Sequence, residues 1–407
     1  MSLTRWRSFA LLLVLLPVLG ATPRKTTPLP TGNLLENGGF ESGLAGHEWM
    51  PAAWDTFDSG LHTSFYMRDT QIAHGGEYAA SVANVSNSIP MFHNWSQVVK
   101  VRPAMWNHDA VVSVWTRSMG VQGRAYVLVQ GFRDTIQKMA LEWKVPRDSA
   151  VVRLNYTATS QPVLLTAWQR QYFSDNETEW VKRDLRVFVP RGTDVLVVRA
   201  GIFGTGQVFV DDASLTIVDA APLRPVANWK NLLADPGFEG DGDEWEYSMP
   251  PYEGLVLGLD TTFVHAGHGA LHAHGGDVGP IQARTGACQI LDARALWDKR
   301  VRLSAYIRTD SLFGSAYVKL YGSTPEGEIA VPTSKVFSGD TDWTLTTFEM
   351  DVPPETYVLS AWLMYNAPTP GRLYFDDASL MVVGPAHYLN GQSPRPTLVP
   401  LAVPGGR

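Results

Sequence analysis

Two pairs of adjacent carboxylates are the residues of this chain with the clearest potential for chemistry. Asp211-Asp212 and Asp376-Asp377 each begin the motif Asp-Asp-Ala-Ser-Leu. Glycoside hydrolysis uses two carboxyl groups about 5–9.5 Å apart, whereas neighbouring side chains on one strand point to opposite faces of a sheet. Because neither pair can then flank one bond, and because the motif occurs twice, we expect a structural role and predict no enzyme activity.

The repeated motif closes a longer duplication. Asn33 opens the segment Asn-Leu-Leu-Glu-Asn-Gly-Gly-Phe-Glu, and Asn231 opens the similar segment Asn-Leu-Leu-Ala-Asp-Pro-Gly-Phe-Glu. Between the opening and closing motifs, Ala125-Tyr126-Val127 recurs as Ala316-Tyr317-Val318. A repeat of this length indicates duplicated domains rather than a solenoid. The sequence therefore predicts a tandem pair of related domains.

The two copies differ by one insertion. The offset between matching residues is 191 at Tyr126 and Tyr317 (317 − 126) but 163 at Trp180 and Trp343 (343 − 180), so the first copy has 28 extra residues. These observations and the composition divide the chain into a signal peptide at 1–21, a Thr/Pro-rich spacer at 22–32, a first domain at 33–218 with an insertion at about 132–179, a linker at 219–230, a second domain at 231–383, and a Pro/Gly-rich tail at 384–407.

The N-terminus predicts secretion. Arg5 and Arg7 precede an apolar run that is too short for a membrane span, which needs about 20 residues. We expect an extracellular monomer with no membrane span in the mature chain, although an uncleaved N-terminal anchor stays open. The net charge of −7 argues against a nucleic-acid partner. Cys288 is the only cysteine, so no internal disulfide can form, and we expect a buried, inert thiol.

Apolar residues alternate along short segments. Val112, Val114 and Thr116 would face one side of a strand, and Ser113, Trp115 and Arg117 the other; Leu303, Ala305 and Ile307 repeat this pattern in the second domain. Period-two alternation broken by Gly and Pro is typical of half-buried antiparallel strands. The predicted fold class is all-β, with two tandem antiparallel β-sandwich (jelly-roll) domains after a signal peptide.

Five motifs in the same order in both domains carry a family resemblance. They are the opening segment, the turn at His74–Ala79 and its counterpart at His265–Ala270, the strand around Trp115, the strand that begins at Trp180, and the closing Asp-Asp motif. In these motifs the chain resembles the cellulose- and xylan-binding modules of families 4 and 9, which have a galactose-binding-domain-like fold. The resemblance covers nearly all of both domains and implies a polysaccharide or glycan partner.

The resemblance also implies one structural Ca²⁺ per domain. The ion would tie the opening segment to the last strand through carboxylates and main-chain carbonyls, which are ligands that Ca²⁺ prefers. By position the ligands are Gly39, Glu41 and Asp211 in the first domain, and Gly237, Glu239 and Asp376 in the second. The alternative is that these acids only cap turns. Separately, His272 and His274 would share a strand face and could bind a transition metal.

Aromatic residues are the candidates for sugar recognition, because aromatic faces stack on pyranose rings while polar groups fix orientation. For each of them, ordinary core packing is the alternative. The candidate carbohydrate-binding residues are Trp115, Arg117, Tyr126 and Trp168 in the first domain, and Tyr306, Arg308, Tyr317 and Trp362 in the second.

The function that these observations predict is a secreted, non-catalytic carbohydrate-binding protein. Two modules would bind polysaccharide through aromatic residues on a sheet face, each supported by a structural calcium. Two alternatives remain open: an extracellular adhesion or structural protein that uses the sandwiches for protein contacts, and an accessory component of a glycoside hydrolase system.

Overall fold

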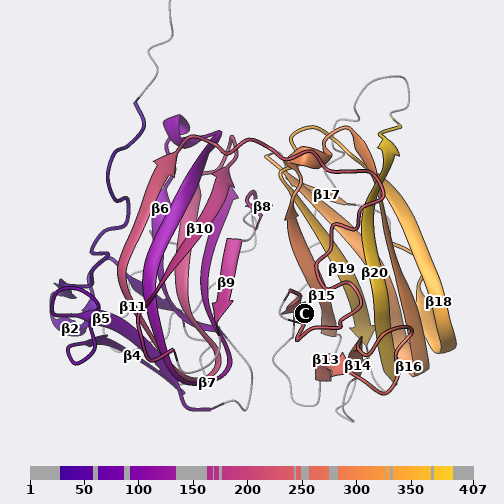
Figure 1. Cartoon of the computed structure of the whole chain (residues 1–407), viewed down its shortest axis with the longest axis horizontal. Coiled ribbons are helices and arrows are strands. Elements are labelled where there is room, and N and C mark those ends of the chain that lie inside the picture. Colours follow the sequence, from indigo (N-terminus) through magenta and orange to yellow (C-terminus); the bar gives the residue numbers. More distant parts are fainter. Residues whose placement is uncertain are drawn as a thin grey trace, which may run out of the picture.

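A computed structural model describes residues 28–57, 63–86, 92–133, 163–167, 169–173, 177–242, 244–248, 256–274, 283–325, 327–330, 333–367 and 371–387 (Figure 1). Within these ranges the chain is built from β-strands and two short 3₁₀ helices, without an α-helix. Among them, accordingly, no helix has the length and apolar character needed to cross a membrane. The predicted signal peptide lies outside the described residues.

The first domain contains one hairpin and one nine-stranded antiparallel sheet, which folds over itself into two layers. Its elements are β1 (Gly43–Leu44), β2 (His47–Pro51), β3 (Asp55–Phe57), β4 (Ser64–Asp69), β5 (Ala79–Asn84), β6 (Phe92–Lys100), η1 (Pro103–Met105), β7 (His108–Arg133), β8 (Val163–Leu164), β9 (Gln169–Phe173), β10 (Val181–Val189) and β11 (Val195–Val218).

The second domain repeats this architecture with a second nine-stranded antiparallel sheet. Its elements are β12 (Glu246–Ser248), β13 (Val256–Asp260), β14 (Ala270–His274), β15 (Ala283–Asp292), η2 (Arg294–Leu296), β16 (Lys299–Thr324), β17 (Gly327–Ala330), β18 (Phe337–Val352), β19 (Val358–Ala367) and β20 (Arg372–Pro385).

Long strands pass from one layer to the other. The first half of β7 pairs with β10 and its second half pairs with β9, while the first half of β11 pairs with β6 and its second half with β5. We call the layer with β4, β5 and β10 the outer layer, and the layer with β3, β6, β8 and β9 the inner layer. In the second domain β13, β14, β18 and β20 belong to the outer layer, and β12, β15, β17 and β19 to the inner layer. Figure 1 shows β9 and β15 side by side between the domains.

The core lies between the two layers of each domain, and the predicted alternation is confirmed. Val112, Val114 and Thr116 are buried, whereas Ser113, Trp115 and Arg117 on the other face of β7 are half-buried. Leu303, Ala305 and Ile307 are buried in the second domain. Cys288 is free and buried on β15, as expected. The all-β prediction of two tandem sandwiches is therefore confirmed.

The insertion in the first domain supplies two of its strands. β8 and β9 both lie within residues 132–179 and extend the inner layer by pairing with the second half of β7. Residues 134–162 and Trp168 are outside the described part of the chain. The insertion therefore adds a strand, β9, whose side chains contact the second domain.

One asparagine in each opening segment ties that segment to the last strand. The Asn231 amide donates to the carbonyl of Ala378 at 3.0 Å, and its Oδ1 accepts the backbone N–H groups of Leu233 and Leu380 at 3.1 and 3.0 Å. Asn33 makes the equivalent three bonds in the first domain. This explains why both opening segments begin with asparagine.

Replacing Asn231 by Ala should lower the free energy of unfolding of the second domain by about 2–3 kcal/mol, because it leaves partly buried backbone groups without partners. The measurement is a urea unfolding curve followed by tryptophan fluorescence. Replacement of the exposed Asn228 in the linker by Ala is the matched control and should change the curve little. Equal midpoints for the two variants would contradict this role of Asn231.

Candidate functional site

Trp115 and Tyr306, two predicted sugar platforms, each have one ring face covered by a histidine. His74 stacks on Trp115 with ring centroids 3.9 Å apart, and His265 stacks on Tyr306 at 3.6 Å. The histidine Nδ1 lies 2.7 Å from the Asp212 carboxylate in the first domain. In the second domain it lies 2.6 Å from the Asp377 carboxylate. The outer layer thus repeats a packed aromatic–histidine–carboxylate motif.

The predicted arginines accompany these aromatics on the outer layer. Arg308 donates to the Asp342 carboxylate at 2.9 Å, and its guanidinium lies 5.4 Å from the centre of the Phe263 ring. Arg117 is half-buried on the same strand face as Trp115. Trp180 and Trp343 contact the stacked histidines edge-on, each at 5.7 Å. Contacts within the protein therefore engage Trp115, Tyr306 and Arg308, whereas the buried Nε of Arg117 has no hydrogen-bond partner among the described residues.

The two adjacent carboxylates at the start of the Asp-Asp-Ala-Ser-Leu motif have different environments. Asp211 is fully buried, and its Oδ2 accepts the backbone N–H groups of His74 and Gly75 at 2.8 and 3.1 Å. Asp212 lies at the surface with a left-handed φ of 45°. Asp376 and Asp377 repeat this division in the second domain. The expectation that the neighbouring carboxylates point to opposite faces does not hold, because the strand bulges between Asp211 and Ser214 and both carboxylates contact His74.

The proposed calcium ligands converge on the same turn. Glu41 Oε1 accepts the backbone N–H groups of Glu77 and Tyr78 at 3.0 and 3.2 Å, beside the N–H groups held by Asp211. Glu239 accepts the N–H of His268, and Asp376 those of His265 and Ala266. A side chain at Gly76, where φ is +67°, would collide with the Glu41 carboxylate. The turn therefore requires glycine there.

The carboxylates proposed as calcium ligands meet some, but not all, of the requirements of a hard cation. Burial raises the pKa of Asp211 to about 6 and also raises the pKa of Asp376, although backbone donors oppose both shifts. Asp211 accepts two N–H groups at Oδ2 and one at Oδ1, which leaves one of the about four acceptor sites of its carboxylate. In the described residues, no group of three or more His, Cys, Asp or Glu side chains is placed to hold a metal. An ion here would need the main-chain oxygens of Gly39 and Gly237.

The histidine pair on β14 also lacks a third metal-ligating side chain among the described residues. The rings of His272 and His274 lie 4.9 Å apart, and burial lowers the pKa of both. His272 also stacks on Tyr374 at 4.9 Å. No third ligand of these types completes a group in the described chain, so a transition-metal site gains no further support.

The inner layer of the second domain carries a cluster that is open on one side. Tyr321 and Trp362 are half-buried, and their rings meet edge-on at 6.4 Å. Lys319 lies opposite Trp362 on the neighbouring strand, with its amine 2.6 Å from the Tyr321 hydroxyl. Tyr317 lies on the same face and is 9% exposed. We call Lys319, Tyr321 and Trp362 the aromatic platform.

The equivalent face of the first domain is closed. Tyr126 matches Tyr317 in the repeat, but it is only 2% exposed, and its hydroxyl accepts a bond from the Asn94 amide at 2.9 Å. Burial raises the pKa of Tyr126 above its ordinary value. Arg199 on the same face donates to Gln130 at 2.7 Å. The first domain thus presents no free aromatic ring at this position.

The two inner layers meet where β9 approaches β12. The Tyr172 hydroxyl donates to the Glu246 carboxylate at 2.7 Å, and Arg170 lies 2.5 Å from the same oxygen. Both partners of this ion pair are largely buried. Arg124 donates to the carbonyl of Trp245 at 3.5 Å. We call these contacts the inter-domain junction.

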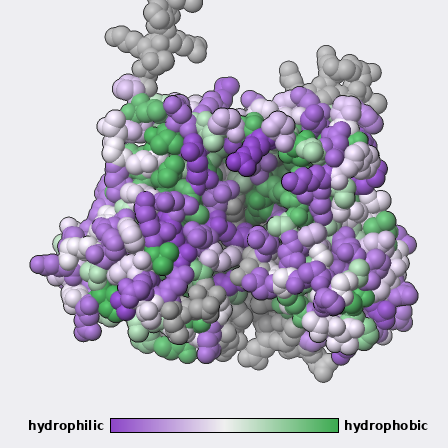
Figure 2. Space-filling view, viewed as in Figure 1, coloured by the Kyte–Doolittle hydropathy of each residue, from purple (hydrophilic) through white to green (hydrophobic). Residues whose placement is uncertain are grey.

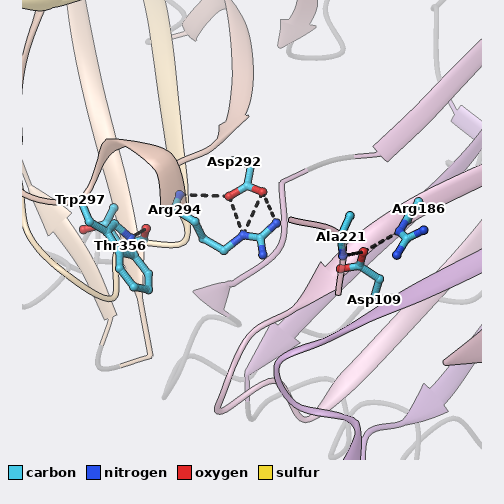
Figure 3. A network of polar contacts seen from close by, with 7 residues as sticks. All are labelled: Asp109, Arg186, Ala221, Asp292, Arg294, Trp297 and Thr356. Atoms are coloured by element: carbon cyan, nitrogen blue, oxygen red, sulfur yellow. Dashed lines mark hydrogen bonds and ion pairs between the residues drawn. The ribbon is translucent and has the colours of Figure 1, made fainter. Parts of the chain in front are cut away.

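A second set of contacts crosses between the domains. The Arg294 guanidinium lies 3.6 Å from the centre of the Phe188 ring, and Asp292 holds the same arginine through three hydrogen bonds. Figure 3 shows this pair facing the ion pair of Asp109 and Arg186 from the first domain. The charges that face each other across this gap are therefore already paired.

Sequence reasoning missed the contacts of the junction. Tyr172 and Glu246 are 74 positions apart and belong to different domains, so no spacing or repeat connects them. Lys319 was also missed, although its place two residues before Tyr321 on a predicted strand puts both on one face. Of the predicted residues, the structure groups Tyr317 and Trp362 on one inner layer, and it separates them from Trp115, Arg117, Tyr306 and Arg308 on the outer layers.

The comparisons with known proteins find likeness in solved structures alone. No family model matches the chain, and no curated protein matches it. The chain is similar to the N-terminal CBM22-1–CBM22-2 tandem domain of Paenibacillus barcinonensis Xyn10C, with 12% identity over 87% of this chain and 99% of that one, and a TM-score of 0.30. It is also similar to the C-terminal family 22 carbohydrate-binding module of Clostridium thermocellum Xyn10B, with 17% identity over 40% of this chain and 100% of that one, and a TM-score of 0.30.

A half-buried carboxyl on the inner layer gives a testable pH dependence. Burial raises the pKa of Asp55 to about 6 from an ordinary value of 3.8. The folded state therefore binds this proton more tightly than the unfolded state, so ionisation of Asp55 lowers stability as pH rises from about 4 to about 6, and the full loss is present above that range. Asp55→Asn should raise the free energy of unfolding by about 1–3 kcal/mol at pH 7.5.

The gain should shrink as the pH falls below about 6 and disappear near pH 4. Thermal unfolding of both proteins across this range measures the difference, and Asp219→Asn at an exposed linker position is the control. A gain that is independent of pH would contradict the assignment.

Proposed function

We propose that this protein is a secreted, monomeric, non-catalytic carbohydrate-binding protein whose main binding surface is the aromatic platform of the second domain. The observation that carries the proposal is the pair of half-buried rings of Tyr321 and Trp362 beside the amine of Lys319 on one sheet face. Aromatic rings stack on the apolar faces of sugars, while an adjacent amine and hydroxyl bond sugar hydroxyls.

The two domains contribute unequally to this proposal. Tyr126 is buried and bonded to Asn94, whereas Trp362 keeps part of its ring accessible. The motif order described above supports a polysaccharide or glycan as the ligand class, and the N-terminal signal supports secretion. A second domain that binds and a first domain that supports it agree with both observations.

The platform is tested with variants of the full chain. Trp362→Ala and Tyr321→Ala should each weaken binding to soluble xylan or β-glucan about tenfold, which is about 1.4 kcal/mol. Affinity electrophoresis with and without the polysaccharide in the gel measures the change. Trp229→Ala is the matched control, because Trp229 is a tryptophan in the linker with 59% exposure. Equal retardation of the Trp362 and Trp229 variants would overturn the platform.

A second candidate function has its own supporting observation. Histidines cover the rings of Trp115 and Tyr306, Tyr126 is buried, and Arg308 pairs with Asp342, so four of the eight predicted sugar residues are engaged by the protein itself. This arrangement favours sandwiches that act as spacers or contact other proteins. An absence of retardation on every polysaccharide tested would favour this adhesion or structural role, or that of an accessory component.

We also propose one structural Ca²⁺ in each domain, held by Glu41, Asp211 and the Gly39 carbonyl, and by Glu239, Asp376 and the Gly237 carbonyl. When bound, the ion would supply positive charge beside two carboxylates and fix the opening segment against the last strand. The buried position of Asp211 and Asp376 supports the proposal.

Calcium at a hundredfold excess over its dissociation constant should stabilise the folded chain by about 2.7 kcal/mol per site. Differential scanning calorimetry in CaCl₂ and in EDTA measures this, and elemental analysis of the dialysed protein counts bound calcium. Glu239→Gln should remove the effect in the second domain alone. An unchanged transition in EDTA, with no calcium found, would leave these acids as turn caps.

A further inference from the structure

Two cavities form one groove between the domains. A cavity of about 420 Å³ lies between β9 and β15, and it is lined by residues 169–172 of the first domain and by Glu244 and residues 289–291 of the second. A cavity of about 170 Å³ continues it, because both cavities include Gln169 and the second adds Asp292, the next residue of β15. Figure 2 shows the surface hollowed between the two domains.

The polar groups of this groove are amides, ion pairs and the carboxylate of Glu244. Gln169 and Gln171 bring amides that both donate and accept hydrogen bonds, and Gln171 is exposed. Three pairs of charged groups lie in or beside the groove: Arg170 with Glu246, Arg186 with Asp109, and Arg294 with Asp292. The exposed Glu244 adds a carboxylate to the lining of the larger cavity. A groove with amides, paired charges and one carboxylate suits a neutral, hydroxyl-rich ligand better than an anionic one.

The groove also lies on the same face as the aromatic platform. Ile290 lines the groove and pairs with Ser360, which pairs in turn with Tyr321. Partners across antiparallel strands point to the same side of a sheet, and neighbouring strands are about 4.8 Å apart. Ile290 and Tyr321 are therefore roughly 10 Å apart on one continuous surface. A ligand stacked on the platform needs to extend only a short distance to enter the groove.

The junction joins the inner layers of the two domains through a row of largely buried side chains, and Gln169 and Gln171 alternate with this row along β9. Glu246 pairs in register with Cys288, and Cys288 pairs with Trp362, so the carboxylate that binds Tyr172 belongs to the same row as the platform tryptophan. In the first domain, Tyr172 pairs with Tyr126. One row of side chains thus runs from β7 through the junction to β16.

We propose that the two domains form a single composite site, in which one neutral saccharide chain lies on the aromatic platform and continues along the inter-domain groove against Gln169 and Gln171. This inference rests on the proposed carbohydrate function and replaces two independent sites by one. A short ligand would occupy the platform alone, whereas a longer one would contact both domains.

Isothermal titration calorimetry with the full chain tests the composite site. The probes are xylohexaose with xylobiose, and cellohexaose with cellobiose. We expect one hexasaccharide per chain, bound more tightly than the disaccharide. The double variant Gln169→Ala/Gln171→Ala should weaken hexasaccharide binding at least tenfold and change disaccharide binding less than twofold. Gln71→Ala, at an exposed turn after β4, is the matched control and should bind like the unaltered protein.

The outcomes separate the two proposals. Unchanged hexasaccharide binding by the double variant, or two hexasaccharides per chain, would overturn the composite site while the platform stands. An equal loss for both ligand lengths would also overturn it, because the platform alone would then explain binding. No heat with any probe would contradict the carbohydrate function, and the composite site with it.

Discussion

One buried carboxylate in each domain organises the rest of the fold. Asp211 and Asp376 lie on the last strand and accept the backbone N–H groups that open the turns at His74 and His265. A buried carboxylate without hydrogen-bond donors costs free energy, so the folded strand is stable only when the turn supplies its N–H groups. The histidine fixed in this way then stacks on Trp115 or Tyr306. The repeated closing motif is therefore a structural device, which explains why it survives in both copies.

The fold could be predicted from the sequence because its causes are local. Alternation along Val112–Arg117 identifies strands and their buried faces, and Asn33 and Asn231 mark the start of each unit. The environment of the outward side chains could not be predicted in this way. Alternation places Trp115 outside the core, but only the path of the chain brings His74 over its ring.

In the candidate site, too, the position of each side chain could be predicted from the sequence, but its contacts could not. Tyr317 and Trp362 were predictable as members of one aromatic group, since both lie on strands of the second domain. Equivalence within the repeat suggested that Tyr126 would behave like Tyr317, and both are indeed buried. Yet the partners differ, because Asn94 bonds the Tyr126 hydroxyl in the first domain. A repeat predicts position in the fold and leaves the contacts of each copy to its own sequence.

The insertion explains why the two domains are coupled rather than independent of each other. β9 is an edge strand, and exposed edges invite pairing with other chains unless they are covered. Here Tyr172 and Arg170 of β9 bind Glu246 of the second domain. A buried carboxylate is tolerated only while its charge and lone pairs are matched, so separating the domains would expose an edge and break a compensated ion pair together. The 28 residues that distinguish the first domain therefore couple it to the second.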